Sequence, residues 1–399
     1  MKNLLLISFL LLLTSAGAVK ANEARVTINA TDTGLAHVPV HADFPAGTFD
    51  AYTPFCIDTD SGLQPAQLET LDNGQQRIWW IANQPAGTQI DASIRTGEDC
   101  PRFTEFRWQA PSPRSSQLLH GHRPILQYEH PVFNSGDIEA TKKPYHHVFD
   151  PESGEKITKG VGGLYSHHRG IFFGYNHVYV DNGDEQIDIW HANDGERSEH
   201  EAILTTFAGP VMGGHVVRIL WKDHDGEPFA EERREIRAFP QPDGNILIDF
   251  KTELHPHANH VKLDGDRQHA GVQFRASQHV ADNPEQSRYI RPDGWAHLDP
   301  DEEVGDDNNT GFGWNAFSFR IEDRPYTVTY MSHPDNPEPA EMSERLYGRF
   351  GEFFRYELTP DNPLNARYRF WISTGDTPGK EQILTRYHNY GQPPNITRQ

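Results

Sequence analysis

The stretch Asn245-Ile-Leu-Ile-Asp-Phe-Lys-Thr-Glu-Leu254 follows the turn dipeptide Asp243-Gly244 and is predicted to form a β-strand. Strand-like segments of this kind dominate the chain from His120 onward. Several are long for strands, which favours a large two-sheet β-sandwich and an all-β fold. One helix is predicted, over Glu381–Tyr390. The other predicted strands are Arg123–Glu129, Gln186–His191, Val216–Lys222, Ala316–Ile321, Tyr326–Met331 and Asn365–Ile372.

The region before residue 109 has shorter alternating strands, with turns at Asp72-Asn73-Gly74 and Pro85-Ala86-Gly87. This pattern is typical of a small β-sandwich. The segment Gln109–Ser116 is rich in Pro and Ser and lacks an apolar period, so it is predicted to be a linker. We therefore expect a small β-sandwich domain over residues 22–112 and a large one over residues 117–399.

The first 21 residues have the pattern of a secretory signal peptide. Lys2 is followed by an apolar run over Leu4–Leu13, and Val19 and Ala21 are small residues placed for cleavage before Asn22. A membrane anchor would need about 20 apolar residues, roughly twice this run. No later stretch is suited to spanning a bilayer. The protein is expected to be exported, to the periplasm or beyond the cell.

Export changes the interpretation of the two cysteines, Cys56 and Cys100. An even number of cysteines in an oxidising compartment favours a disulfide. Two buried thiols or one reactive cysteine are the alternatives.

Composition excludes one class of partner. The chain has 36 Lys and Arg against 57 Asp and Glu, a formal net charge of −21, so general nucleic-acid binding is not expected. The 22 histidines are the unusual feature. Fifteen of them fall within residues 120–200 and 255–279, alongside Arg169 and Arg275. A locally cationic cleft in an acidic protein would suit an anionic sugar.

The densest polar segment is Lys143–His191, which includes Ser166-His167-His168-Arg169-Gly170. Histidine exchanges protons near neutral pH and binds metals, and arginine can hold a carboxylate through two hydrogen bonds. Adjacent histidines on a strand point to opposite faces, so one of each pair is expected to be structural. The candidate catalytic residues here are Tyr145, His146 and His168, and the candidate substrate-binding residues are Arg169, Asn176 and Trp190.

Two further groups add candidates. On a strand, His269, Gln273 and Arg275 share one face, which suggests a binding surface with His269 catalytic. A polar, half-exposed sheet face is the alternative. Arg349 lies among glycines and charges in a segment between strands, where salt-bridged packing is the alternative.

The signal for a metal site is weak. The chain has no His-Glu-x-x-His and no Cys-x-x-Cys motif, and the pairs His255/His257 and His120/His122 lack an obvious third ligand. No cofactor is predicted, and the metal content is left open.

Several separated motifs resemble the exported bacterial proteins labelled "methane oxygenase PmoA-like", over roughly residues 120–390. The resemblance implies a soluble β-rich domain similar to the large sandwich of aldose mutarotases and many polysaccharide lyases, in bacteria that degrade complex polysaccharides. It transfers no residue roles. The motifs are Lys143-Pro144-Tyr145-His146, Ser166–Gly170, Asp188-Ile189-Trp190-His191, Asp266–Gly271, Ser332–Pro337, Ser343–Arg345 and Tyr347–Gly351.

Together these observations suggest a carbohydrate-active enzyme, best interpreted as a lyase or dehydratase on uronate-containing oligosaccharides. Such an elimination needs a cation, for which Arg169, Arg275 or Arg349 are candidates, and a base and an acid, drawn from His and Tyr. A glycoside hydrolase or sugar epimerase on the same fold is the first alternative, with Glu129, Asp188, Glu201 and Glu344 as available carboxylates. A non-catalytic carbohydrate-binding protein and a copper oxidase are the others.

Overall fold

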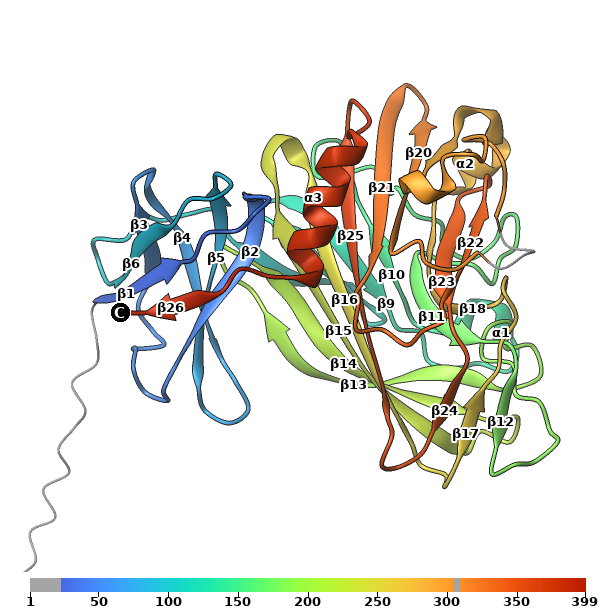
Figure 1. Ribbon diagram of the computed structural model, residues 1–399. Helices are drawn as coiled ribbons and strands as arrows, with labels where there is room; N and C mark the ends of the chain where they lie inside the picture. The colour runs from blue at the N-terminus through green and yellow to red at the C-terminus, as the bar shows by residue number, and fades with distance from the viewer. Residues whose placement is uncertain (1–22, 305–308) are drawn as a thin grey trace, which may run out of the picture.

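The computed structural model describes residues 23–304 and 309–399; the predicted signal peptide over residues 1–21 lies outside the described residues. The N-terminal region forms one antiparallel seven-stranded sheet (Figure 1), whose two edge strands contact each other around a separate apolar core. In sheet order its strands are β2 (Leu35–Phe44), β5 (Gln76–Gln84), β4 (Gly62–Thr70), β3 (Phe55–Thr59), β6 (Ile90–Thr96), β1 (Glu23–Ile28) and β26 (Ile396–Arg398).

The rest of the chain forms two eight-stranded antiparallel sheets, which confirms the predicted all-β, sandwich-like fold. In sheet order, the first large sheet contains β22 (Glu341–Arg345), β23 (Arg349–Phe353), β18 (Ala270–Arg275), β11 (Ile171–Tyr175), β10 (Tyr145–Val148), β9 (Arg123–Glu129), β8 (Ser115–His120) and β7 (Phe106–Ser112). The second contains β13 (Arg197–Phe207), β14 (Gly213–Lys222), β15 (Pro228–Pro240), β16 (Ile246–Pro256), β25 (Leu364–Thr374), β21 (Arg324–Ser332), β20 (Trp314–Ile321) and β19 (Arg288–Ile290).

A shorter sheet and a few helices complete the large domain. The three-stranded sheet contains β12 (Val178–Val180), β17 (Val261–Leu263) and β24 (Tyr356–Leu358). The α-helices are α1 (Ile138–Thr141), α2 (Gln278–Asp282) and α3 (Lys380–Gly391), and the last confirms the predicted C-terminal helix. Short 3-10 turns occur at Pro242–Gly244, Pro284–Gln286 and Asp293–Trp295.

Strand β16 shows why the two large sheets stack. Successive side chains of a strand point to opposite faces, and Ile246, Ile248 and Phe250 all enter the apolar core between the sheets. Leu247 points the other way and packs with Trp371 and with Ile383 of helix α3. The first part of the strand is therefore apolar on both faces, because the first large sheet covers one face and helix α3 covers the other.

The N-terminal sheet lies against the outer face of the second large sheet, beside helix α3 (Figure 1). Trp79 and Ile81 pack onto the apolar cluster beneath that helix. Glu69 pairs with Arg237 at 2.7 Å across the same contact. The C-terminal strand β26 crosses back and pairs with β1. The predicted division at residue 112 therefore leaves out a strand that the small sheet takes from the end of the chain.

Two sequence interpretations need correction. Residues 109–116 are not a linker, because they lie in the hairpin between β7 and β8, whose backbones pair within the first large sheet. Pro and Ser are compatible with an edge strand and a tight turn, which is what this segment forms. Gln186–His191 is not a strand; it makes a single bridge, Val178 to Ile187, and then turns.

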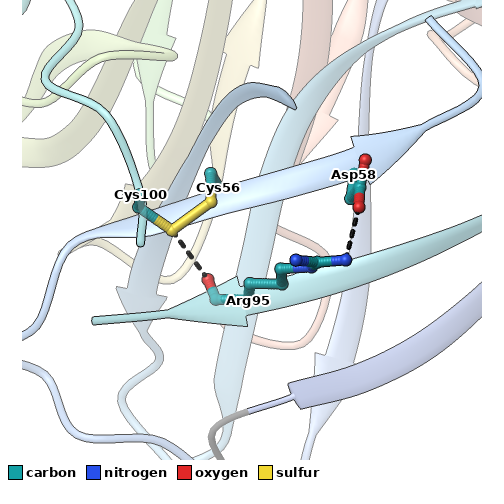
Figure 2. Close-up of a disulfide and its surroundings, with 4 residues drawn as sticks. All are labelled: Cys56, Asp58, Arg95 and Cys100. Atoms are coloured by element: carbon teal, nitrogen blue, oxygen red, sulfur yellow. Dashed lines mark hydrogen bonds and ion pairs between the residues drawn. A yellow bond between two sulfur atoms is a disulfide. The ribbon is translucent and has the colours of Figure 1, made fainter. Parts of the chain in front are cut away.

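Cys56 and Cys100 form a disulfide, as the predicted oxidising compartment favoured (Figure 2). Cys56 lies on β3 and Cys100 follows β6, and the two Cα atoms are 5.4 Å apart. Next to the disulfide, Asp58 pairs with Arg95 at 2.5 Å. None of the helices in the described ranges has the length and apolar character needed to cross a membrane.

Candidate functional site

Most of the predicted site residues lie on the face of the first large sheet that points away from the core. Val272 and Phe274 of β18 belong to the core between the sheets, so the alternating residues Gln273 and Arg275 point outward. By the same alternation, Tyr145, Phe172 and Arg349 also lie on this outer face. The second large sheet separates this face from the small N-terminal sheet, so the site and the small sheet are on opposite sides of the sandwich.

Three loops over this outer face bring together His167, His191 and His269, which we call the imidazole cluster. The ring centroids of His167 and His191 are 4.5 Å apart, and those of His191 and His269 are 4.8 Å apart. One nitrogen from each ring lies within 4.8 Å of the others. All three side chains are partly exposed, so the cluster is open to solvent.

Two of these histidines are held by the same Asp-x-x-His arrangement. Asp266 accepts hydrogen bonds from the backbone N–H and from ring Nδ1 of His269, both at 2.9 Å. Asp188 does the same for His191, at 2.7 and 2.8 Å. A carboxylate acceptor assigns the proton to Nδ1, which leaves the lone pair of Nε2 free on each ring. This is the arrangement in which histidines bind metal ions.

The two carboxylates are themselves fixed. Burial raises the pKa of Asp266, but hydrogen bonds from His269 and from the Gln268 backbone outweigh it, and the net pKa is lowered. Asn176 donates to Asp266 Oδ2 at 2.7 Å and accepts from its backbone N–H. For Asp188, burial is likewise outweighed by hydrogen bonds from His191, so its pKa is also lowered. Both groups are therefore ionised at neutral pH.

His167 is the third member, and no carboxylate of the described residues pairs with it. Its Nε2 is buried and has no hydrogen-bond partner within the described residues. Burial, followed by the charge of Lys143 and the neighbouring His191, lowers the pKa of His167 to about 2. The ring is therefore neutral and has a free lone pair at physiological pH.

A layer of aromatic rings lies beside and beneath the cluster. Trp190 is fully buried and packs on Phe172, and the His168 ring lies 5.6 Å from Trp190. Neither nitrogen of His168 has a partner in the part of the chain that the structure describes. Tyr347 lies nearly parallel to His168, with an interplanar angle of 8° and centroids 6.2 Å apart. Tyr165, which is 49% exposed, lies 5.0 Å from Tyr347 and extends this layer to the surface.

The backbone that carries the cluster is strained. Tyr165, two residues before His167, has φ of +53°, and Ala192, directly after His191, also has φ of +53°. Non-glycine residues rarely adopt this conformation, and it costs roughly 1 kcal/mol or more at each position. Gly170 ends the His167 loop with φ of +48°, where an added Cβ would lie against the carbonyl oxygen of His146. Strain of this kind tends to occur at functional sites.

The three arginines predicted to bind substrate are buried. Arg169, Arg275 and Arg349 are at most 1% exposed. Arg169 pairs with Glu139, Arg275 donates to the carbonyl oxygens of Ala276 and Tyr347, and Arg349 donates to Ser343 and Gln273. Arg169 and Arg275 also donate to the carbonyl oxygens of Ser166 and Leu164 in the loop that carries His167, and Arg349 ties β23 to β22 and β18. We therefore correct their assignment from substrate contacts to residues that support the site.

The other predicted binding residues are buried as well. Asn176 holds Asp266, Trp190 accepts a hydrogen bond from Lys143 at its carbonyl oxygen, and Gln273 is fully buried. Tyr145 lies on the outer face but is only 5% exposed, and burial followed by the Glu129 charge raises its pKa to about 12. Of the predicted site residues, His269 is the one whose side chain belongs to the exposed cluster.

His146 is not part of the site. It points into the sandwich, where its ring stacks on Tyr128 at 4.7 Å and its Nε2 lies 2.8 Å from Nε2 of His215 on β14. Its neighbour Val148, two residues on, is also in the core. The strand alternation described above places Tyr145 and His147 outward, so His146 is the structural member of its histidine pair.

Sequence reasoning missed His167, His191, Asp188, Asp266 and Tyr347 as site residues. A recoverable signal existed, because Asp-x-x-His occurs twice, at Asp188–His191 and Asp266–His269. His-x-His spacing on strands does not reveal this arrangement, since the three imidazoles come from three separate loops.

The fold and the site define a β-sandwich protein with a carboxylate-supported imidazole cluster on one outer face. Residues 115–386 match the model of a family described as DUF6807, a family of unknown function, and the chain belongs to that family. The match covers the large sandwich except for strand β7 and the end of helix α3, and it includes every residue of the cluster. It neither supports nor contradicts the predicted resemblance to the PmoA-like proteins. No curated protein matches the chain.

Proposed function

We propose that this protein is an exported enzyme that cleaves acidic carbohydrates by elimination. The observation that carries the proposal is that the open imidazole cluster and the aromatic side chains of Tyr165 and Tyr347 share one face. The rings of Tyr165 and His167 are 6.1 Å apart. Aromatic rings suit the apolar faces of sugars, and the titratable groups beside them supply acid–base chemistry.

In the proposed reaction, the carboxylate of a uronate residue is neutralised so that the adjacent C5–H becomes acidic. A base removes that proton, the electron pair forms the C4–C5 double bond, and the C4–O bond breaks. The departing oxygen takes up a proton, so no water is consumed. Because the arginines are buried and the His167 ring is neutral, the neutralising charge is assigned to a cation that the imidazole cluster would hold. Tyr347 is proposed to remove the proton and to return it to the leaving oxygen.

A hydrolase is less well supported. Glycoside hydrolysis rests on a pair of carboxylates across the scissile bond. Asp188 is bonded to His191, and Glu344 is buried beside Arg291 and Asn315. Glu129 on β9 lies opposite Tyr145 on β10. Glu201 is exposed on β13 of the other large sheet. Among these four candidates, Asp188 is already held by His191, and Glu344 and Glu201 lie away from the site face, which leaves Glu129 without a free carboxylate partner among them.

The proposed location and substrate class have separate support. The Cys56–Cys100 disulfide is compatible with an oxidising compartment, where the N-terminal pattern predicts the protein to be. The two stacked eight-stranded sheets are compatible with the predicted mutarotase- and lyase-like sandwich. Fold alone does not fix function, so the proposal rests on the site.

The test is to incubate the purified protein with a panel of uronate oligosaccharides and to follow the absorbance of the unsaturated product. Mass spectrometry of the fragments gives the second readout. Elimination conserves the summed mass of substrate in the products, whereas hydrolysis adds one water. Fragments that have gained water would reassign the enzyme as a hydrolase. The absence of any product across the panel, from protein with an intact circular dichroism spectrum, would overturn the proposed enzyme activity.

A further inference from the structure

The imidazole cluster has the chemistry of a metal centre. Three neutral imidazoles with an open position are a common set of protein ligands for catalytic zinc. Tetrahedral ligation with bonds of about 2.0 Å places nitrogen ligands roughly 3.3 Å from one another. The three rings offer nitrogens within 4.8 Å of one another, so a small inward movement of the side chains brings them to this spacing.

The surroundings of the cluster also match a metal site. Asp188 and Asp266 orient two of the rings through Nδ1, as carboxylates do for metal-bound histidines, and Asn176 in turn holds Asp266. These two carboxylates bring negative charge that a divalent cation would balance. The buried Nε2 of His167 has no other partner in residues 23–304 and 309–399. A buried polar atom left without a partner destabilises the fold, and a bound ion would remove this cost.

We propose that His167, His191 and His269 bind one divalent transition-metal ion, with Zn²⁺ as the best match, and that Asp188 and Asp266 are its supporting carboxylates. The partial exposure of the rings leaves a further coordination position open to solvent. A carboxylate is a suitable ligand for that position. The metal would thus be the neutralising cation of the proposed elimination, and this part of the inference rests on the proposed function. Metal binding itself does not.

The primary experiment measures Zn²⁺ binding to chelator-treated protein in the absence of sugar, by competition with a chromophoric chelator. We expect one ion per chain. His167→Ala, His191→Ala and His269→Ala should each weaken binding at least 100-fold. The exposed histidine His257, on the other side of the sandwich core, provides the matched control His257→Ala, which should leave the affinity unchanged. Equal affinity in the cluster variants and the control would overturn the proposal.

A second measurement uses the wild-type protein and therefore tests the site even if the variants fold poorly. Co²⁺ added to the wild-type protein should give the intense visible absorption of a tetrahedral site, and one equivalent of Zn²⁺ should abolish it. A weak octahedral spectrum, or one unchanged by Zn²⁺, would contradict the three-histidine site. Because neither experiment uses a sugar, a protein that binds Zn²⁺ but forms no unsaturated product would leave the metal site standing and refute the elimination.

Discussion

Nδ1 of His269 lies 2.9 Å from Oδ1 of Asp266, and the same oxygen accepts the backbone N–H of His269. One carboxylate thus fixes both the backbone turn and the ring. Asp188 likewise accepts both bonds from His191 in a different loop, one through each of its carboxylate oxygens. Two loops that are distant in sequence therefore present imidazoles with the same free nitrogen toward the same region.

The first prediction concerns these carboxylates. Asp266→Asn keeps the size of the side chain but removes the charge that fixes the Nδ1–H tautomer of His269. Loss of such a supporting group typically weakens metal binding about 10–100-fold, so we expect a loss in this range, and a similar one for Asp188→Asn. Zn²⁺ competition titrations measure both. Asp184→Asn, at an exposed position, is the control and should show no change. Unaltered affinity in both cluster variants would show that the carboxylates are not coupled to the metal.

The second prediction concerns Tyr347. Removing a general acid–base group typically slows catalysis 10²–10⁴-fold, so Tyr347→Phe should reduce kcat at least 100-fold. Zn²⁺ affinity should not change, because the phenol is not a proposed ligand. Tyr165→Phe keeps the exposed ring and should alter kcat less than tenfold. Initial rates of unsaturated product give both values. A Tyr347→Phe enzyme with more than a tenth of wild-type kcat would remove Tyr347 from the mechanism.

The fold was largely predictable because strand signals are local. The apolar run at 246–250 and its preceding turn are visible in the sequence, and the structure places them in a central strand. The segment 109–116 was misinterpreted because Pro and Ser favour a linker and an edge hairpin alike, and only pairing with β8 distinguishes them. The strand predicted over Gln186–His191 failed for a related reason. Ile187 and Ile189 join the main apolar core and Trp190 packs on Phe172, with no strand pairing beyond a single bridge.

The site was less predictable because a cluster depends on which loops meet. Residue type correctly drew attention to Ser166–Gly170, Asp188–His191 and Asp266–His269. Residue type could not show that Arg275 and Arg349 donate hydrogen bonds to carbonyl and side-chain oxygens inside the protein. Residue type also could not show which of two neighbouring histidines faces the site, since strand register decides this.

The third prediction tests the reassignment of His146. His146→Ala removes a ring stacked on Tyr128 and leaves His215 without its partner, so it should lower the free energy of unfolding by roughly 2–4 kcal/mol. The affinity for Zn²⁺ should be unchanged in the folded protein. His269→Ala should show the opposite pattern, with little loss of stability and a large loss of binding. Denaturant titration and metal competition on both variants test this, and weakened metal binding by His146→Ala would return it to the site.

The fourth prediction concerns the disulfide. Cys56 and Cys100 are 44 residues apart, and closing a loop of that length stabilises a fold by roughly 4 kcal/mol in the chain-entropy model. The variant in which both are Ser should lose about that much stability in the unfolding of the small sheet. Zn²⁺ binding should persist, because the imidazole cluster lies across the sandwich from that sheet. Denaturant titration followed by tryptophan fluorescence measures the loss. A change below 1 kcal/mol would mean that the small sheet does not depend on the crosslink.

The fifth prediction is a pH dependence of stability that originates at Glu352. This side chain is 4% exposed on β23, and burial raises its pKa from 4.5 to about 7 in the folded protein, against a weaker lowering by a hydrogen bond from Ser332. The folded state therefore holds a proton that the unfolded state releases between pH 4.5 and 7. Stability from this group is fully present below pH 4.5 and is lost as the pH rises to about 7, by an amount on the order of 3 kcal/mol.

Glu352→Gln removes that titration while it keeps a neutral, hydrogen-bonding side chain. The phenols of Tyr330 and Tyr368 face the same group, and burial raises the pKa of both, so they stay neutral in this range. The variant should therefore lose less stability than the wild type between pH 5 and pH 7.5 in denaturant titrations. The exposed residue Glu201 supplies the control, since Glu201→Gln should leave the wild-type slope intact. If the Glu352→Gln protein has the same pH dependence as the wild type, the carboxyl of Glu352 is ionised in the folded state and its negative charge is stabilised within the sandwich.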